Sequence, residues 1–215
     1  VEVRNMKYAG MPMGMWLLFS GSFKEKLTSV LGFSNEEAAK ITAAAKPRYK
    51  AIIADLPEFE KQDRFKMNIV NCAMIAAFIL NMPVRPSVDK LTKYYADSMM
   101  TGKMRWFCKK SAKNKYTEKD IAGMKSTAAF RAADRNPYSW NMDFYEYSDG
   151  SGYEARFDRC GICTLMQELG LYDLTSAMCR LDYTMSDAGG ASDFVREYTL
   201  ASGGPYCDCG YHRKK

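Results

Sequence analysis

The stretch 140-WNMDFYEYSDGSGYEARFD-158 marks the point at which the sequence pattern changes. Apolar and polar residues alternate in WNMDFYEY and again in YEARFD, and the Gly-containing SDGSG between them is typical of a hairpin turn. The stretch therefore predicts two antiparallel strands. From here on, over residues 136–215, we expect strands and helices to be mixed.

Upstream of this hairpin the pattern is helical. Apolar residues at helical spacing predict helices over about residues 12–31, 34–56, 60–82 and 87–107, with a fifth, shorter helix that begins at Thr117. Pro47 is expected to kink or split the second helix, because proline lacks a backbone N–H and clashes with the preceding turn. Residues 1–135 are thus expected to be mainly helical.

Downstream of the hairpin, CGICTLMQELGL (160–171) and LTSAMCRLDYTM (174–185) return to helical spacing. DFVREYTLA (193–201) and PYCDCGYH (205–212) alternate again and predict a second pair of strands. The sequence therefore predicts an α+β fold in one domain, 1–215. A helical N-terminal layer is followed by a small antiparallel sheet with two further helices, and 136–215 is the part expected to carry a functional site.

Composition restricts the partners. The net charge is +6, yet Lys and Arg are scattered and no nucleic-acid reader motif accompanies them, so we expect no nucleic-acid partner. The longest apolar run, residues 69–80, is shorter than the roughly 20 residues of a membrane span, so we expect no membrane partner. Seven cysteines, an odd number, favour a reducing, cytoplasmic compartment. A small molecule is the expected partner.

The cysteines allow two interpretations. Thiolates bind zinc, and Cys160-x-x-Cys163 together with Cys207-x-Cys209 offers two close pairs. However, Cys163 is predicted inside a helix and the second pair inside a strand, whereas zinc ribbons hold their ligands in short loops. Buried, inert thiols are the alternative. We expect no metal and no cofactor.

Side-chain geometry within the predicted elements groups several residues. In a strand, Cys207, Cys209 and Tyr211 share one face, whereas Asp208 and His212 share the other. On a helix, Cys179 and Asp182 stand three residues apart and therefore share a face.

Asn71 interrupts an apolar helix. A buried amide must find hydrogen-bonding partners. Either a ligand or a polar network in the core would satisfy it, and we include Asn71 among the candidate substrate-binding residues.

The C-terminal segments RFDRCGICTLMQELGL (156–171), MCRLDYTM (178–185) and FVREYTLASGGPYCDCGY (194–211) resemble the L-2-amino-thiazoline-4-carboxylic acid hydrolase family. The resemblance covers roughly residues 140–212, and position 209 is Cys where the family tends to have an aromatic residue. It singles out the following positions: Cys160, Cys179, Asp182, Arg196, Thr199, Gly203, Cys207 and Asp208.

This resemblance implies hydrolytic opening of a cyclic isothiourea that bears a carboxylate, or of a related C–N or C–S substrate. Such a reaction needs a nucleophile, a proton donor and a cation for the carboxylate. Cys207 or Cys179 would attack, or Asp182 or Asp208 would activate water, with Arg196 binding the carboxylate. Cys160 belongs to the same catalytic group, and Thr199, Gly203 and Asn71 are assigned to substrate binding. The alternative is a non-enzymatic module that binds a small ligand or a metal through its cysteines.

Overall fold

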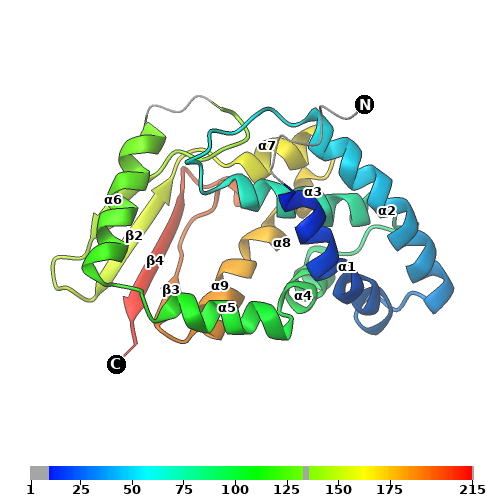
Figure 1. Ribbon diagram of the computed structural model, residues 1–215, viewed down its shortest axis with the longest axis horizontal. Coiled ribbons are helices and arrows are strands. Elements are labelled where there is room, and N and C mark those ends of the chain that lie inside the picture. The colour runs from blue at the N-terminus through cyan, green and yellow to red at the C-terminus, as the bar shows by residue number, and fades with distance from the viewer. Residues whose placement is uncertain (1–9, 133–135, 215) are drawn as a thin grey trace.

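The computed structural model describes residues 10–132 and 136–214. The architecture is α+β, as predicted: helices dominate the N-terminal part, and the strands form one antiparallel sheet toward the C-terminus (Figure 1). The strands are β1 (Asp143–Glu146), β2 (Gly152–Phe157), β3 (Ser192–Val195) and β4 (Cys207–Arg213). Their order across the sheet is β1-β2-β4-β3, so the C-terminal strand β4 pairs on both edges.

The helical part consists of α1 (Met11–Ser29), α2 (Asn35–Asp55), α3 (Lys66–Ile79), α4 (Val88–Met99), α5 (Gly102–Ala112) and α6 (Glu118–Ala132). Ser34 starts α2 with a capping box, and Ser87 starts α4 by accepting the N–H of Lys90. The apolar α3 is buried from Cys72 to Ile79 and forms the centre of the main core. That core also contains residues downstream of the hairpin, such as Leu165 and Met178, so both parts of the chain share it.

Two details of the predicted helices are corrected. Pro47 was expected to kink or split α2, and the helix is not split; Ala45 and Tyr49 on either side of Pro47 are buried. The helix expected over residues 87–107 is two helices, because the Thr101 hydroxyl accepts the N–H of Met104 and thereby starts α5 anew.

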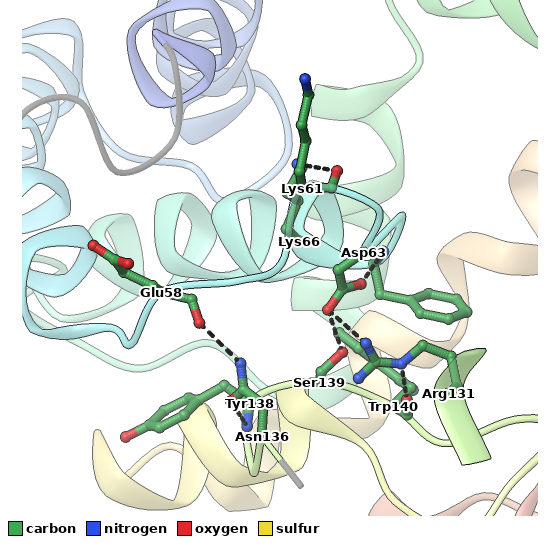
Figure 2. Close-up of polar contacts among 10 residues, drawn as sticks. Glu58, Lys61, Asp63, Lys66, Arg131, Asn136, Tyr138, Ser139 and Trp140 are labelled. Carbon is green, nitrogen blue, oxygen red and sulfur yellow. Dashed lines mark hydrogen bonds and ion pairs between the residues drawn. The ribbon is translucent and has the colours of Figure 1, made fainter. Parts of the chain in front are cut away.

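A buried ion pair joins the segment before α3 to the end of α6 (Figure 2). Asp63 Oδ2 accepts hydrogen bonds from Arg131 Nη1 at 3.0 Å and from the Ser139 hydroxyl at 2.7 Å. Arg131 Nε donates to the Trp140 carbonyl at 2.6 Å. Arg131 is 1% exposed, so this network holds the start of the α+β part onto the helical part.

The segments after the hairpin also differ in detail from the prediction. The helix expected over residues 160–171 is α7 (Gly161–Glu168), and the one expected over 174–185 divides into the short 3-10 helix η2 (Tyr172–Leu174), α8 (Ser176–Cys179) and α9 (Leu181–Gly189). The strand expected over 193–201 ends at Val195 and is followed by η3 (Leu200–Ser202). The backbone N–H groups of Glu197 and Tyr198 bond the Asp208 carboxylate instead of a strand.

The inner face of the sheet is covered by helices. Ala155 and Cys209 pair across β2 and β4 and pack in a second apolar cluster with Met142 and Phe194, against which Met124 of α6 packs. Figure 1 shows α6 on one side of the sheet and α5 and α9 beside β3. Among the helices of residues 10–132 and 136–214, none combines the length and the apolar character that crossing a bilayer requires.

Candidate functional site

Arg196, directly after β3, is the centre of a hydrogen-bond network that joins three elements. Its Nη1 donates to the Cys179 carbonyl at 2.9 Å, and its Nη2 donates to Asp182 Oδ2 at 2.6 Å and to Cys209 Sγ at 2.8 Å. Its Nε donates to the Asp208 carbonyl at 3.2 Å. The side chain is only 5% exposed. Arg196 therefore holds the α8–α9 junction against β4.

Most of the hydrogen-bonding capacity of Arg196 is used within the protein. Four of its five N–H groups donate to the protein, which leaves one N–H on Nη1 without an acceptor among the described residues. The contacts favour a positioning role, in which Arg196 fixes the Asp182 carboxylate. Cys179 and Asp182 lie on two consecutive helices rather than on one face of a single helix, and Arg196 hydrogen-bonds both residues.

Asp208 points away from the thiols of β4, as strand alternation predicts. Its Oδ1 accepts the N–H of Tyr198 at 2.6 Å, and its Oδ2 accepts the N–H of Glu197 at 2.7 Å. The carboxylate thereby fixes the backbone that follows Arg196. These contacts tie Asp208 to the shape of the β3–β4 connection.

The predicted site thiols lie close enough to influence one another's ionisation. Burial, together with the neighbouring Cys160 and Cys207 thiols, raises the pKa of Cys179 to about 12. Burial also raises the pKa of Cys207, and Cys160 adds to the effect. Cys160, before α7, thus acts electrostatically on Cys179 at the end of α8 and on Cys207 at the start of β4.

Cys207 combines a backbone hydrogen bond with a nearby cation. Its Sγ accepts the backbone N–H of Leu200 at 3.2 Å, and this contact lowers its pKa, as does the charge of Arg196. Burial still dominates, so the net pKa is raised. Hydrogen bonding to a thiolate and a nearby cation are the two features that activate a cysteine.

Two further cysteines belong to this group, although the resemblance did not include them. Cys163, in the first turn of α7, shares a hydrogen bond with Cys160 that raises the Cys160 pKa, with burial adding to the effect. Cys72 of α3 is fully buried, and burial, followed by Cys160 and Cys179, raises its pKa. The C-x-x-C spacing was a signal for Cys163, whereas nothing in the sequence marks Cys72.

The residues assigned to substrate binding other than Arg196 are Thr199, Gly203 and Asn71. Thr199 accepts the N–H of Ser202 at 3.1 Å and starts η3. Gly203 ends η3 with a φ of 79°, in the left-handed region where glycine is favoured. Asn71 donates to the Tyr95 hydroxyl at 2.8 Å, and its buried Oδ1 has no partner among the described residues. Only the amide nitrogen of Asn71 is thus satisfied by a core network.

Two pockets border the Arg196–Asp182 pair, one lined by Asp182 and the other by Arg196. The first, which we call the sheet pocket, has a volume of about 360 Å³ and lies between the inner face of the sheet and helices α5, α6 and α9. Polar groups on its walls include Asp182, Cys209, Lys115, Asp120 and Tyr211.

The second, which we call the α8 pocket, has a volume of about 610 Å³ and lies beside α4, α8 and the β3–β4 connection. Cys179, Arg196 and Thr199 contribute to its walls. Both volumes suit a small molecule. Asp182 is the predicted site carboxylate that lines the sheet pocket, with its side chain 45% exposed.

No group of three or more His, Cys, Asp or Glu side chains within residues 10–132 and 136–214 is arranged to hold a metal ion. Cys163 does lie inside a helix, and Cys207 and Cys209 inside a strand, as the sequence predicted.

The fold and these pockets define an α+β protein with thiols, a carboxylate and a buried guanidinium gathered between a sheet and its covering helices. The sequence profile of the L-2-amino-thiazoline-4-carboxylic acid hydrolase family matches residues 73–211. The chain belongs to this family. No curated protein and no solved structure matched the chain.

Proposed function

We propose that the protein is a hydrolase of a small, carboxylate-bearing cyclic isothiourea or a related C–N or C–S substrate. Family membership supports the reaction class. The observation that carries the proposal is the position of Asp182: Arg196 holds one carboxylate oxygen, while the side chain lines the sheet pocket. Asp182 Oδ1 has no hydrogen bond to the described residues, so it is available to a water molecule or a substrate.

Hydrolysis of such a substrate can use a fixed carboxylate as a general base. In a cyclic isothiourea, one carbon is bonded to a ring nitrogen, a ring sulfur and an exocyclic nitrogen. Water adds to this carbon and loses a proton, and then either the ring C–N or the ring C–S bond breaks with proton transfer to the leaving atom. A positioned carboxylate that accepts the proton of the attacking water accelerates such a step by roughly 10²- to 10⁴-fold. In our proposal Asp182 has this role.

The contacts of Cys207 favour a second route to the same products. In this route the Cys207 thiolate adds to the ring carbon, and the ring C–S or C–N bond breaks with proton transfer to the leaving atom. Water then adds to the same carbon of the covalent intermediate, and the bond to the Cys207 sulfur breaks, which regenerates the thiol. The Leu200 N–H and Arg196 stabilise the thiolate that this route needs. Cys179 and Cys209, whose pKa values burial raises to about 12, remain neutral near pH 7 and are poorer nucleophiles.

The test is turnover of 2-amino-thiazoline-4-carboxylate by the purified protein. Cleavage of the C–S bond releases a thiol, and cleavage of the C–N bond releases a primary amine, so thiol- and amine-reactive reagents distinguish the two products. Asp182→Asn is expected to lower kcat by about 100-fold or more, whereas Asp187→Asn, an exposed carboxylate on the same helix, is the matched control and keeps full activity. Wild-type protein without turnover, or an Asp182→Asn variant with unchanged kcat, would overturn the proposal.

Cys207→Ser separates the two routes. If Cys207→Ser lowers kcat as much as Asp182→Asn does and leaves the melting temperature unchanged, the attack is assigned to the thiol. Retention of activity assigns it to water. Mass spectrometry of protein quenched during turnover provides an independent readout, because only the thiol route leaves a covalent adduct on the chain.

A further inference from the structure

The turn between α5 and α6 holds Lys115 in the sheet pocket. The next residue, Tyr116, has a φ of 64°, which is uncommon for a residue other than glycine and costs roughly 1 kcal/mol or more. Two contacts maintain this conformation: the Tyr116 N–H donates to Asp120 Oδ2 at 2.8 Å, and the Tyr116 hydroxyl donates to Ser192 Oγ at 2.6 Å. The turn is therefore anchored both to α6 and to β3.

The ammonium group of Lys115 lies over an aromatic wall. Its Nζ is 3.2 Å from the centre of the Tyr211 ring and 5.5 Å from that of Tyr153. It makes no hydrogen bond or ion pair with the described residues, although a lysine on a turn ordinarily extends into water. Burial lowers the pKa of Lys115 to about 8, with Asp120 acting in the opposite direction. The three N–H donors of a cation are thus presented to the pocket without protein acceptors.

The other charged side chains of the sheet pocket hydrogen-bond to protein groups. Arg64 is exposed and donates to Thr127 Oγ1 at 3.2 Å. Asp120 Oδ2 accepts from Tyr116 and also from the Tyr153 hydroxyl at 3.0 Å. Asp182 is held by Arg196. Lys115 is therefore the cation in this pocket that is best placed to receive an anionic group from a ligand.

We propose that Lys115 binds the carboxylate of the substrate in the sheet pocket, with the isothiourea directed toward Asp182. This inference rests on the proposed function, which supplies a substrate that carries both groups. Opposite charges on the pocket walls match a molecule with an anionic carboxylate and a basic, amidine-like ring. Lys115 takes over the role that the sequence resemblance assigned to Arg196.

Binding of two non-hydrolysed probes tests the inference independently of turnover. The probes are 2-aminothiazole-4-carboxylate and 2-aminothiazole, which differ only in the carboxylate, and calorimetry measures their Kd values. Wild-type protein is expected to bind the carboxylate probe at least about tenfold more tightly, the effect of one well-placed charge pair. Lys115→Met is expected to abolish this preference. Lys113→Met, at an exposed position of the same turn, is the matched control and should preserve it.

The outcomes for this inference and for the proposed function are separable. A Lys115→Met protein that keeps the preference for the carboxylate probe overturns the inference, and so does wild-type protein that shows no such preference. Probe binding that depends on Lys115 without turnover of the cyclic isothiourea supports the carboxylate site and refutes the proposed hydrolysis. Thermal melts monitor folding, and Lys115→Gln, which keeps a polar side chain, replaces Lys115→Met if the latter does not fold.

Discussion

Replacing Asp208 with Asn is expected to destabilise the protein while leaving the chemical groups of the site in place. Asparagine has one carbonyl oxygen, so it can accept only one of the two N–H groups that now bond the carboxylate at 2.6 and 2.7 Å. Its NH₂ group faces the other N–H and leaves that donor unpaired. Loss of one charge-assisted bond at a partly exposed site costs about 2 kcal/mol. For a chain of this size, the melting temperature should fall by about 4 to 8 °C.

Asp193→Asn is the matched control for this prediction. Asp193 lies on the neighbouring strand, is 66% exposed and pairs with Lys214 at 3.4 Å. An exposed pair of this kind contributes little, so its loss should change stability by less than about 0.5 kcal/mol. Differential scanning calorimetry and steady-state turnover on both variants are the assays. An Asp208→Asn protein with an unchanged melt but no activity would refute the reasoning, because the carboxylate would then act in the reaction.

Three other predictions concern stability, pH and metal. Arg131→Met leaves the Asp63 carboxylate buried without its cation, and urea unfolding should show a loss of about 3 to 5 kcal/mol; a loss below 1 kcal/mol would contradict this. The KM for a carboxylate-bearing substrate should rise as pH increases through about 8, because Lys115 loses its proton and its positive charge there, although Asp120 favours the charged form. A substrate without the carboxylate should show no such rise. A metal chelator should leave the melting temperature unchanged, and a large decrease would show that a metal supports the fold.

Local sequence patterns predicted most of the helices and strands. The alternation in residues 140–158 and 205–212 correctly predicted β1, β2 and β4, because a strand in a sheet with one covered face requires a period of two. Helices α1, α2, α3, α4 and α6 followed from apolar periodicity and caps such as Ser34, whereas the new start of α5 at Thr101 was missed. The error in β3 lies where a side chain distant in sequence competes with the local pattern: Asp208 takes the N–H groups that would have extended β3.

The candidate site was only partly accessible from sequence. Asp182, Cys207 and Arg196 were marked by the family resemblance, and strand alternation separated Cys207 from Asp208. Lys115 was missed because it appears as one more cation in a basic turn. The helix start predicted at Thr117, where the hydroxyl accepts the N–H of Asp120 at 3.2 Å, was a signal that the turn is ordered, yet it does not show which way the lysine points.

The sequence by itself determined the elements of this protein and the faces of its strands, since backbone hydrogen bonding and burial repeat at short, regular intervals. The tertiary structure alone decided which charged groups meet. Arg196 reaches Cys179, Asp182 and Cys209 because the sheet order places β3 beside β4 and α9 packs against β3. Lys115 enters the sheet pocket because Ser192, far along the chain, anchors the turn that carries it. Such contacts depend on long-range packing, for which no local periodicity exists.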